Sequence, residues 1–383
     1  MQKCILNNVH EKRDSINIVC YIIYQFYETY WRHKFLDLMH LKICRPIFKY
    51  LIIFRNTIIS ESSSTTLSVR GKMQNVELLH NTIGRSPQHL NDVIYVEPEN
   101  CDTKGNNRDQ YGADKNRILV YFGGDVQDLS SNMKLHRDNQ KYLRWSLEET
   151  AALLSQSYPH DYIMVVRPNR MERSTFSCFD NFVESNSCGA PTHLTHKIVD
   201  KTNSNSSCHA LLQLRGLIHS VTRLKGLVGN EMSPPKLTLV GFSKGVVVLN
   251  QILHDLHILN SMQHEGESKM KDDLSRFSDK IERMIWLDGG HNGGKDTWIT
   301  DEEVLKTLAT KTNINIEVKV TPYQVQDNRR PWIGKEEKRF RNILGNKFDL
   351  ISSKRLIRSL HFAEEEANIE NHFKILTTLS CDM

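Results

Sequence analysis

The chain has 383 residues, of which 39% are hydrophobic, and this is enough for one large α/β domain or two small ones. Its formal net charge is +5, but residues 1–72 hold eleven Lys/Arg against five Asp/Glu, so the remaining residues are almost neutral. A nearly neutral body without a nucleic-acid-binding motif predicts no nucleic-acid partner, because phosphate contacts need clustered cations. The eight cysteines form no Cys-x-x-Cys pair and no zinc spacing, so we expect free thiols and no metal.

Residues 1–72 differ in composition from the rest and are predicted to be an N-terminal extension. The apolar run at 16–31 is interrupted by two polar residues, so we expect no transmembrane span. Residues 39–72 are rich in Arg/Lys and Ser and contain one acid, Glu61, which is typical of a mitochondrial transit peptide. A secretory signal or a surface helix of the mature protein are the alternatives, and Met39 is a second candidate start. The sequence therefore predicts a mitochondrial protein, with the matrix as its compartment.

The remaining chain, 73–383, alternates between two kinds of segment. Apolar runs typical of buried parallel strands occur at 92–96, 118–122, 162–166, 237–240, 284–287, 314–320 and 360–362. Helices are expected between them, after a capping box at 146–149 and at 211–224, 246–259 and 335–344. This alternation predicts an α/β fold with a mostly parallel sheet and helices on both faces. Residues 168–207 break the alternation and are expected to form a cap over the sheet edge or a surface loop.

The pentapeptide Gly241–Gly245 reads Gly-Phe-Ser-Lys-Gly and lies between a predicted strand and a predicted helix. Gly-x-Ser-x-Gly in this context is typical of the nucleophile elbow of α/β-hydrolases, in which a sharp turn exposes the serine hydroxyl. The flanking glycines allow the strand and the helix to approach each other closely. A glycine-rich turn of another α/β protein is the alternative. The pattern predicts Ser243 as a catalytic nucleophile.

A serine hydroxyl needs a histidine base, and in this fold the residues follow in the order Ser, acid, His. We expect His372 to be the base because it follows the last predicted strand and precedes a helical segment. It would then overhang the same sheet edge as Ser243. His361 lies inside the predicted strand and is better explained as a packed strand residue.

Two aspartates compete for the position of the acid. Asp327 is preferred because it follows the strand at 314–320, on the loop where this fold usually carries the acid. Asp288 ends the strand at 284–287 and is the alternative. If Asp327 is the acid, Asp288 and His291 are expected to shape the pocket or contact the substrate.

The oxyanion hole is expected to use two backbone N–H groups. One belongs to Lys244, which follows the nucleophile, and the other to Gly124, in the glycine pair after the strand at 118–122. The phosphate-binding patterns Gly-x-x-x-x-Gly-Lys-Ser/Thr and Gly-x-Gly-x-x-Gly are both absent from the sequence, so no cofactor is expected.

Several segments resemble one poorly characterised animal family, named after a human chromosome 2 open reading frame. They are Tyr121–Gln127, Phe176–Asn186, Leu239–Gly245, Trp286–His291 and Thr321–Val325, and the resemblance covers about residues 85–383. Members of the family look like α/β-hydrolases and are associated with mitochondria, so the resemblance implies that fold and location but no substrate. It also implies that 176–186 is a built part of a cap. The chain departs from the family pattern at Gly123, where we expect proline, and this leaves Gly124 as the safer oxyanion donor.

Two classes of function follow from these observations. The first is a serine hydrolase that cleaves an ester or thioester of a small acyl substrate through Ser243, His372 and Asp327. The positive charge of Lys244 would then favour an acidic or phosphorylated acyl substrate; the alternative is that its side chain is simply solvated. The second is a non-catalytic α/β-hydrolase-fold protein that binds or regulates a mitochondrial partner, since a fold persists without its chemistry.

Overall fold

The structure is a computed structural model that describes residues 64–67, 75–99, 117–187, 189–193, 195, 208–227, 235–262 and 268–380. All of them lie in one compact unit, Ser62–Met383. The predicted targeting segment falls outside the described residues, apart from strand β1 (Ser64–Leu67). Because β1 pairs antiparallel with β2 (Val76–Ile83), the sheet begins within the range 1–72 that was predicted to be extension.

Among the described residues, nine strands form one sheet in the order β1-β2-β3-β5-β4-β10-β11-β12-β13. The further strands are β3 (Leu90–Val96), β4 (Arg117–Phe122), β5 (Tyr162–Val166), β10 (Lys236–Phe242), β11 (Ile281–Leu287), β12 (Asn315–Val320) and β13 (Leu356–Leu360). Neighbouring strands are parallel throughout the run β5-β4-β10-β11-β12-β13, whereas β3 pairs antiparallel with both β2 and β5. This is the strand order of the α/β-hydrolase fold, so the predicted fold class is confirmed.

Helices cover both faces of the sheet. They are α4 (Ser130–Leu135), the 3₁₀ segment η1 (Asn139–Trp145), α5 (Leu147–Ser157), α6 (His209–Leu224), α7 (Val246–Ser261), α8 (Ser268–Ser278), α9 (Glu302–Lys311), α10 (Pro322–Val325), α11 (Pro331–Asn342) and α12 (Ile369–Lys374). Alternate side chains of β4 pack into two hydrophobic cores, because successive residues of a strand point to opposite faces of the sheet. Ile118, Val120 and Phe122 pack with residues of α6, α7, α9 and α11, while Leu119 and Tyr121 pack with residues of α5 and α12.

The local helix signals are mostly confirmed. The Ser146 hydroxyl accepts a hydrogen bond from the Glu149 N–H at 3.3 Å and starts α5, as the capping box predicts. The polar and charged residues Ser268–Ser278 form α8, which buries Leu274 against the core. The last strand, expected at 360–362, ends at Leu360. Within the described ranges, no helix has the length and apolar character needed to cross a bilayer.

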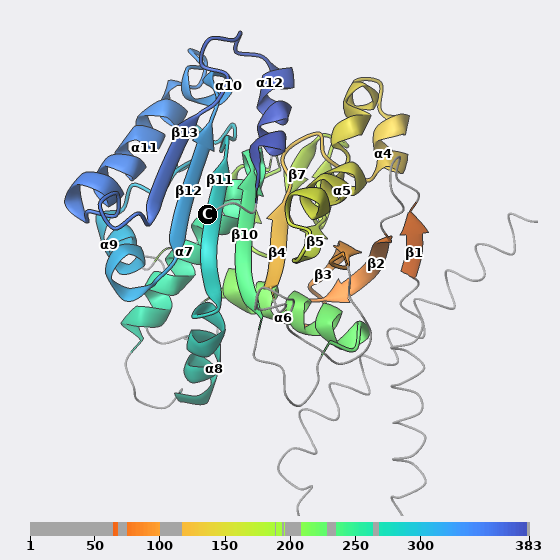
Figure 1. Ribbon diagram of the computed structural model, residues 1–383, viewed down its shortest axis with the longest axis horizontal. Helices are drawn as coiled ribbons and strands as arrows, with labels where there is room; N and C mark the ends of the chain where they lie inside the picture. Colours follow the sequence, from red (N-terminus) through yellow and green to blue (C-terminus); the bar gives the residue numbers. More distant parts are fainter. Residues whose placement is uncertain are drawn as a thin grey trace, which may run out of the picture. The chain divides into compact units, whose positions relative to one another are not determined.

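The described part of the insertion 168–207 packs on the sheet. It contains two short hairpins, formed by β6 (Arg170–Glu172) with β7 (Phe176–Cys178) and by β8 (Glu184–Ser185) with β9 (Pro191–Thr192). Phe179 and Phe182 are buried and contact the ring of Phe122 edge to face, with centroids 5.8 and 5.2 Å apart. Phe122 is the last residue of β4, so the insertion lies at the carboxyl end of the parallel strands. Figure 1 shows α10 and α12 beyond the same end, toward which the arrows of β10 to β13 point.

Candidate active site

Ser243 occupies the turn between β10 and α7 and has the backbone of a nucleophile elbow. Its φ is +51°, in the left-handed region that a residue with a side chain rarely adopts. The turn is tight, because a Cβ on Gly245 would lie 2.1 Å from the carbonyl oxygen of Phe122. A Cβ on Gly241 would lie 2.9 Å from the Cα of Val246. Both glycines of the pentapeptide are therefore required for the close packing of α7 on the sheet.

His372 is held in α12 by aromatic rings on both sides. Its ring stacks on Phe242 and on Tyr323, with centroids 4.6 and 4.7 Å apart, and only 4% of the residue is exposed. Phe242 directly precedes Ser243, so this contact keeps the imidazole beside the elbow. Its Nδ1 lies 2.7 Å from Oδ2 of Asp288. Since an ionised carboxylate only accepts hydrogen bonds, Nδ1 carries the proton and Nε2 is left with a lone pair.

Asp288 is the carboxylate that contacts this histidine. It follows β11 directly, is fully buried, and has a φ of +44°. Besides His372, it accepts hydrogen bonds from the backbone N–H of Thr321, at 2.7 Å, and from the Thr321 hydroxyl. These donors fix the position and orientation of the carboxylate. No motif or residue spacing in the sequence singles out Thr321. Its hydrogen bonds to Asp288 were therefore not predicted from the sequence.

Asp327, the preferred acid, has other partners. Its Oδ2 accepts a 2.7 Å hydrogen bond from Nε of Arg330, and its Oδ1 accepts one from the N–H of Arg329 at 2.8 Å. Partial burial alone would raise the pKa of this carboxyl, but the hydrogen bonds from the two arginines lower it. The expectation that Asp327 pairs with His372 was therefore wrong. Thr321, directly after β12, donates its backbone N–H to Asp288. The helical turn α10 then separates Thr321 from Asp327.

Ser243 and His372 line the same pocket, which has a volume of about 480 Å³. Phe176 of the insertion, Tyr323 and Arg329 also line it. Among the described residues, no side chain is hydrogen-bonded to the Ser243 hydroxyl. Hydrogen bonds between catalytic groups are often long without substrate and tighten when it binds. The geometry therefore provides a serine and an oriented imidazole in one pocket, with the acid behind the imidazole.

His291 also lines this pocket, but both of its ring nitrogens are occupied. Nδ1 accepts the N–H of Gly293 at 2.9 Å, and Nε2 lies 3.4 Å from the carbonyl oxygen of Asp296, to which it donates. Burial lowers the pKa of His291 to about 4, so the ring is neutral near pH 7. This histidine shapes the wall of the pocket, and its nitrogens are not available as a base.

The backbone N–H of Gly124 is not free to stabilise an oxyanion. It donates to Oε1 of Gln127 at 3.0 Å, which contradicts the expected role of Gly124 as a donor. The glycine matters for a different reason, because a Cβ at this position would lie 2.5 Å from the Cβ of Ser243. Sequence reasoning missed Gln127, whose side-chain oxygen also accepts the Tyr121 hydroxyl at 2.8 Å.

The side chain of Lys244 is buried and paired. Only 3% of it is exposed, and its Nζ lies 3.1 Å from Oδ1 of Asp125. The same oxygen accepts the backbone N–H and the hydroxyl of Ser177, at 2.8 and 3.2 Å. The Lys244 ammonium also lies 5.1 Å from the ring centroid of Phe176. This lysine therefore links the elbow to the insertion, and its charge is neutralised by Asp125.

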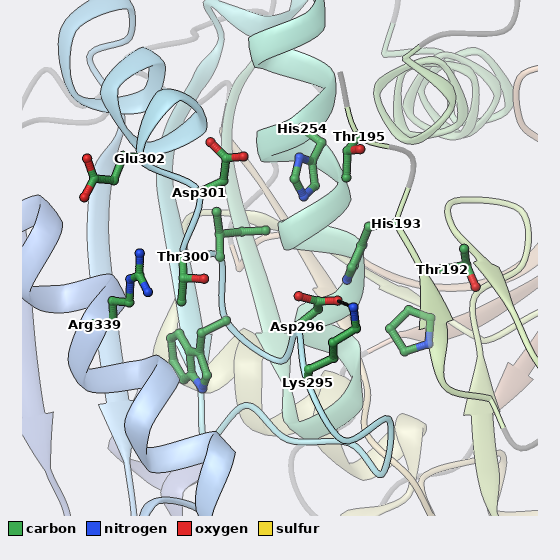
Figure 2. A pocket seen from close by; sticks show the side chains of 13 residues that line it. Thr192, His193, Thr195, His254, Lys295, Asp296, Thr300, Asp301, Glu302 and Arg339 are labelled. Atoms are coloured by element: carbon green, nitrogen blue, oxygen red, sulfur yellow. Dashed lines mark ion pairs between the residues drawn. The ribbon is translucent and has the colours of Figure 1, made fainter. Parts of the chain in front are cut away.

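A larger cavity of about 760 Å³ lies apart from Ser243. Figure 2 shows His254 on α7 and His193 of the insertion at one side of it, with Lys295 and Asp296 below them. The two imidazole centroids are 5.8 Å apart, and burial lowers the pKa of His193 to about 3. The described residues that line this cavity contain neither a serine nor a cysteine. The smaller pocket, which Ser243 lines, is therefore the candidate active site.

Comparison with known proteins places the chain in a family. The family model described as C2orf69 matches residues 78–228 and 223–349. The human mitochondrial protein C2orf69 is 34% identical over 359 residues, which cover 82% of this chain and 89% of the human protein. The chain belongs to the C2orf69 family. The zebrafish (Danio rerio) homologue, also named as a mitochondrial C2orf69 protein, is 35% identical over 310 residues, covering 76% of this chain and 82% of that protein.

This member of the C2orf69 family is also similar to solved hydrolase structures. An acylaminoacyl peptidase of Pyrococcus horikoshii matches with 11% identity and a TM-score of 0.34, covering 84% of this chain. The chain spans 41% of the length of that peptidase. The assignment to the α/β-hydrolase fold rests on the strand order and pairing described above.

Proposed function

We propose that the chain is a serine hydrolase that cleaves an ester or thioester of a small acyl substrate. The observation that supports this most is the pairing of His372 with Asp288 in the pocket that Ser243 also lines. The left-handed φ of Ser243 adds to it, because backbone strain of this kind is concentrated at functional sites.

In the proposed mechanism, Nε2 of His372 takes the proton of the Ser243 hydroxyl while the serine oxygen attacks the acyl carbonyl carbon. Asp288 accepts the Nδ1–H hydrogen bond throughout and stabilises the imidazolium that forms. The imidazolium then protonates the leaving alcohol or thiol as its bond to the acyl carbon breaks. Water attacks the acyl-serine in the second half, with His372 again as the base. The acid is released and the Ser243 hydroxyl is restored.

The proposed oxyanion hole uses the backbone N–H groups of Lys244 and Asp125. Lys244 follows the nucleophile at the start of a helix, where N–H groups lack partners within the helix. On the opposite loop, Gly124 and Val126 donate to Gln127 and Thr175. The N–H of Asp125 between them has no acceptor among the described residues, and Asp125 lines the pocket.

A fluorophosphonate probe tests the function directly. We expect the purified full-length protein to be labelled at Ser243, because the probe reacts with serines that a neighbouring base activates. Ser243→Ala should abolish labelling, and Ser261→Ala, at the end of α7, should leave it unchanged. Labelled peptides are identified by mass spectrometry. Absence of labelling in protein with a cooperative thermal unfolding transition would refute the hydrolase and favour the non-catalytic binding protein.

We also propose that the chain acts in mitochondria, in the matrix, and that its basic, acid-poor N-terminal segment targets it there. The names of the human and zebrafish relatives support the organelle, and the composition of residues 39–72 supports the targeting role. A fusion of residues 39–75 to a fluorescent protein should collect in mitochondria and be protected from protease when the outer membrane is opened. A diffuse cytosolic signal would contradict the proposal, and protease digestion would exclude the matrix.

A further inference from the structure

One charged side chain that lines the candidate active site, the Arg329 guanidinium, has no ion-pair partner among the described residues. Two carboxylates line it, those of Asp125 and Asp327, together with two guanidinium groups, those of Arg329 and Arg330. Each carboxylate also has an identified cationic partner, and only one of these partners is outside the pocket lining. That partner is the buried Lys244, which lies 3.1 Å from Asp125.

The Asp327 carboxylate accepts hydrogen bonds from two arginines. Its Oδ2 is engaged by the guanidinium of Arg330, which also lies over the Tyr323 ring at 5.8 Å. Arg329 donates its backbone N–H to Oδ1, and its guanidinium forms no ion pair with Asp327. The Arg329 guanidinium has no ion-pair partner among the described residues, and this side chain is exposed at the pocket. With Asp125 paired to Lys244 and Asp327 to Arg330, the Arg329 guanidinium is the charged group of the pocket lining that is left without a paired counter-ion among the described residues.

We propose that the substrate of this site carries an anionic group, a carboxylate or a phosphate, which the Arg329 guanidinium binds. The inference rests on the proposed hydrolase function, and it specifies the substrate class. A guanidinium presents a planar fork of N–H donors that matches both kinds of anion. The neighbouring arginine is already fixed by Asp327 and Tyr323, so it shapes the pocket while Arg329 stays available.

Arg329, and not Lys244, is then the source of the preference for acidic substrates. The buried Lys244 ammonium already has Asp125 and the Phe176 ring as partners. An anion approaching it would have to displace the insertion that covers it. Arg329 follows α10 and precedes α11, so it reaches the same pocket from the side of Tyr323.

The test compares two chromogenic esters of equal acyl length, the neutral 4-nitrophenyl pentanoate and the anionic mono-4-nitrophenyl glutarate. We expect the wild-type protein to have the higher kcat/KM for the anionic ester at low ionic strength, and added salt to reduce the preference. Arg329→Gln should lower the ratio of the two kcat/KM values about tenfold or more, as for loss of a hydrogen bond to a charged group. Lys338→Gln, on the exposed surface of α11, removes the same charge and should leave the ratio unchanged.

Calorimetric titration with glutarate and with inorganic phosphate gives a readout that needs no turnover. We expect one of these anions to bind the wild-type protein about tenfold more tightly than Arg329→Gln. The anion that binds distinguishes carboxylate from phosphate. If Ser243 is not labelled by the fluorophosphonate but anion binding depends on Arg329, the hydrolase proposal fails and the anion site stands. Equal ester ratios in wild type and Arg329→Gln, or binding of neither anion, would overturn the anion site whether or not Ser243 is reactive.

Discussion

Asp288→Asn is expected to lower hydrolysis of a neutral 4-nitrophenyl ester by about 10³- to 10⁴-fold in kcat, with little change in KM. The asparagine keeps an oxygen for the Thr321 N–H but turns its amide NH₂ toward Nδ1 of His372. The imidazole must then carry its proton on Nε2, where it cannot take one from Ser243. Loss of the correct tautomer has an effect of this size in serine hydrolases of unrelated fold.

Asp327→Asn is the matched control for this prediction, because it makes the same change in the other aspartate at the site. It removes the charge that pairs with Arg330 at the pocket, and leaves the hydrogen bond between His372 and Asp288 in place. We expect kcat to fall less than about tenfold, since the catalytic hydrogen bonds remain. Steady-state kinetics and the rate of fluorophosphonate labelling measure both variants. If Asp327→Asn lost most of its kcat while Asp288→Asn stayed active, Asp327, on the loop after β12, would be the acid of the triad.

Gly245→Ala is expected to destabilise the protein by about 3 kcal/mol or more, because a Cβ cannot be accommodated between α7 and β4. Its nearest neighbours would be the carbonyl oxygen and carbon of Phe122 and the carbonyl oxygen of Gly123, at 2.1, 2.6 and 2.8 Å. These are backbone atoms at the end of a central strand, and they cannot move without disturbing the sheet. For a domain of this size the loss corresponds to a fall in Tm of roughly 4–5 °C or more, measurable by circular dichroism.

Gly123→Ala is a control for this second prediction, one loop away. There a Cβ would meet side-chain atoms, Oε1 of Gln127 at 3.0 Å and Cδ2 of Leu147 at 3.1 Å. Side chains yield more easily than backbone, so the expected cost is only about 1 kcal/mol. Equal losses of Tm in the two alanine variants would show that the close approach of α7 to β4 does not require Gly245.

The strand pattern and the elbow were readable in the sequence because they depend on neighbouring residues. Buried parallel strands are apolar along their whole length, so β4, β5, β10, β11 and β12 were found within a few residues of their bounds. Strand β2 was missed, because it lies near the edge of the sheet and alternates in burial, with polar residues such as Glu77 and Asn81. The sharp turn at Ser243 was predicted from Gly-x-Ser-x-Gly between a strand and a helix, since the motif and the turn are both local.

By itself the sequence determined the fold class, the position of Ser243 in the turn after a strand, and the choice of His372 as the expected base. Chain order, apolar runs and the glycine spacing contain that information. Only the tertiary structure decided which aspartate contacts His372 and which N–H groups are already occupied. Asp288 and Asp327 both follow parallel strands that end at the same sheet edge. From the sequence, the only ground for preferring one of them is the loop on which this fold usually carries its acid. The choice between them depends on where Thr321, Arg330 and the aromatic rings place their atoms in space.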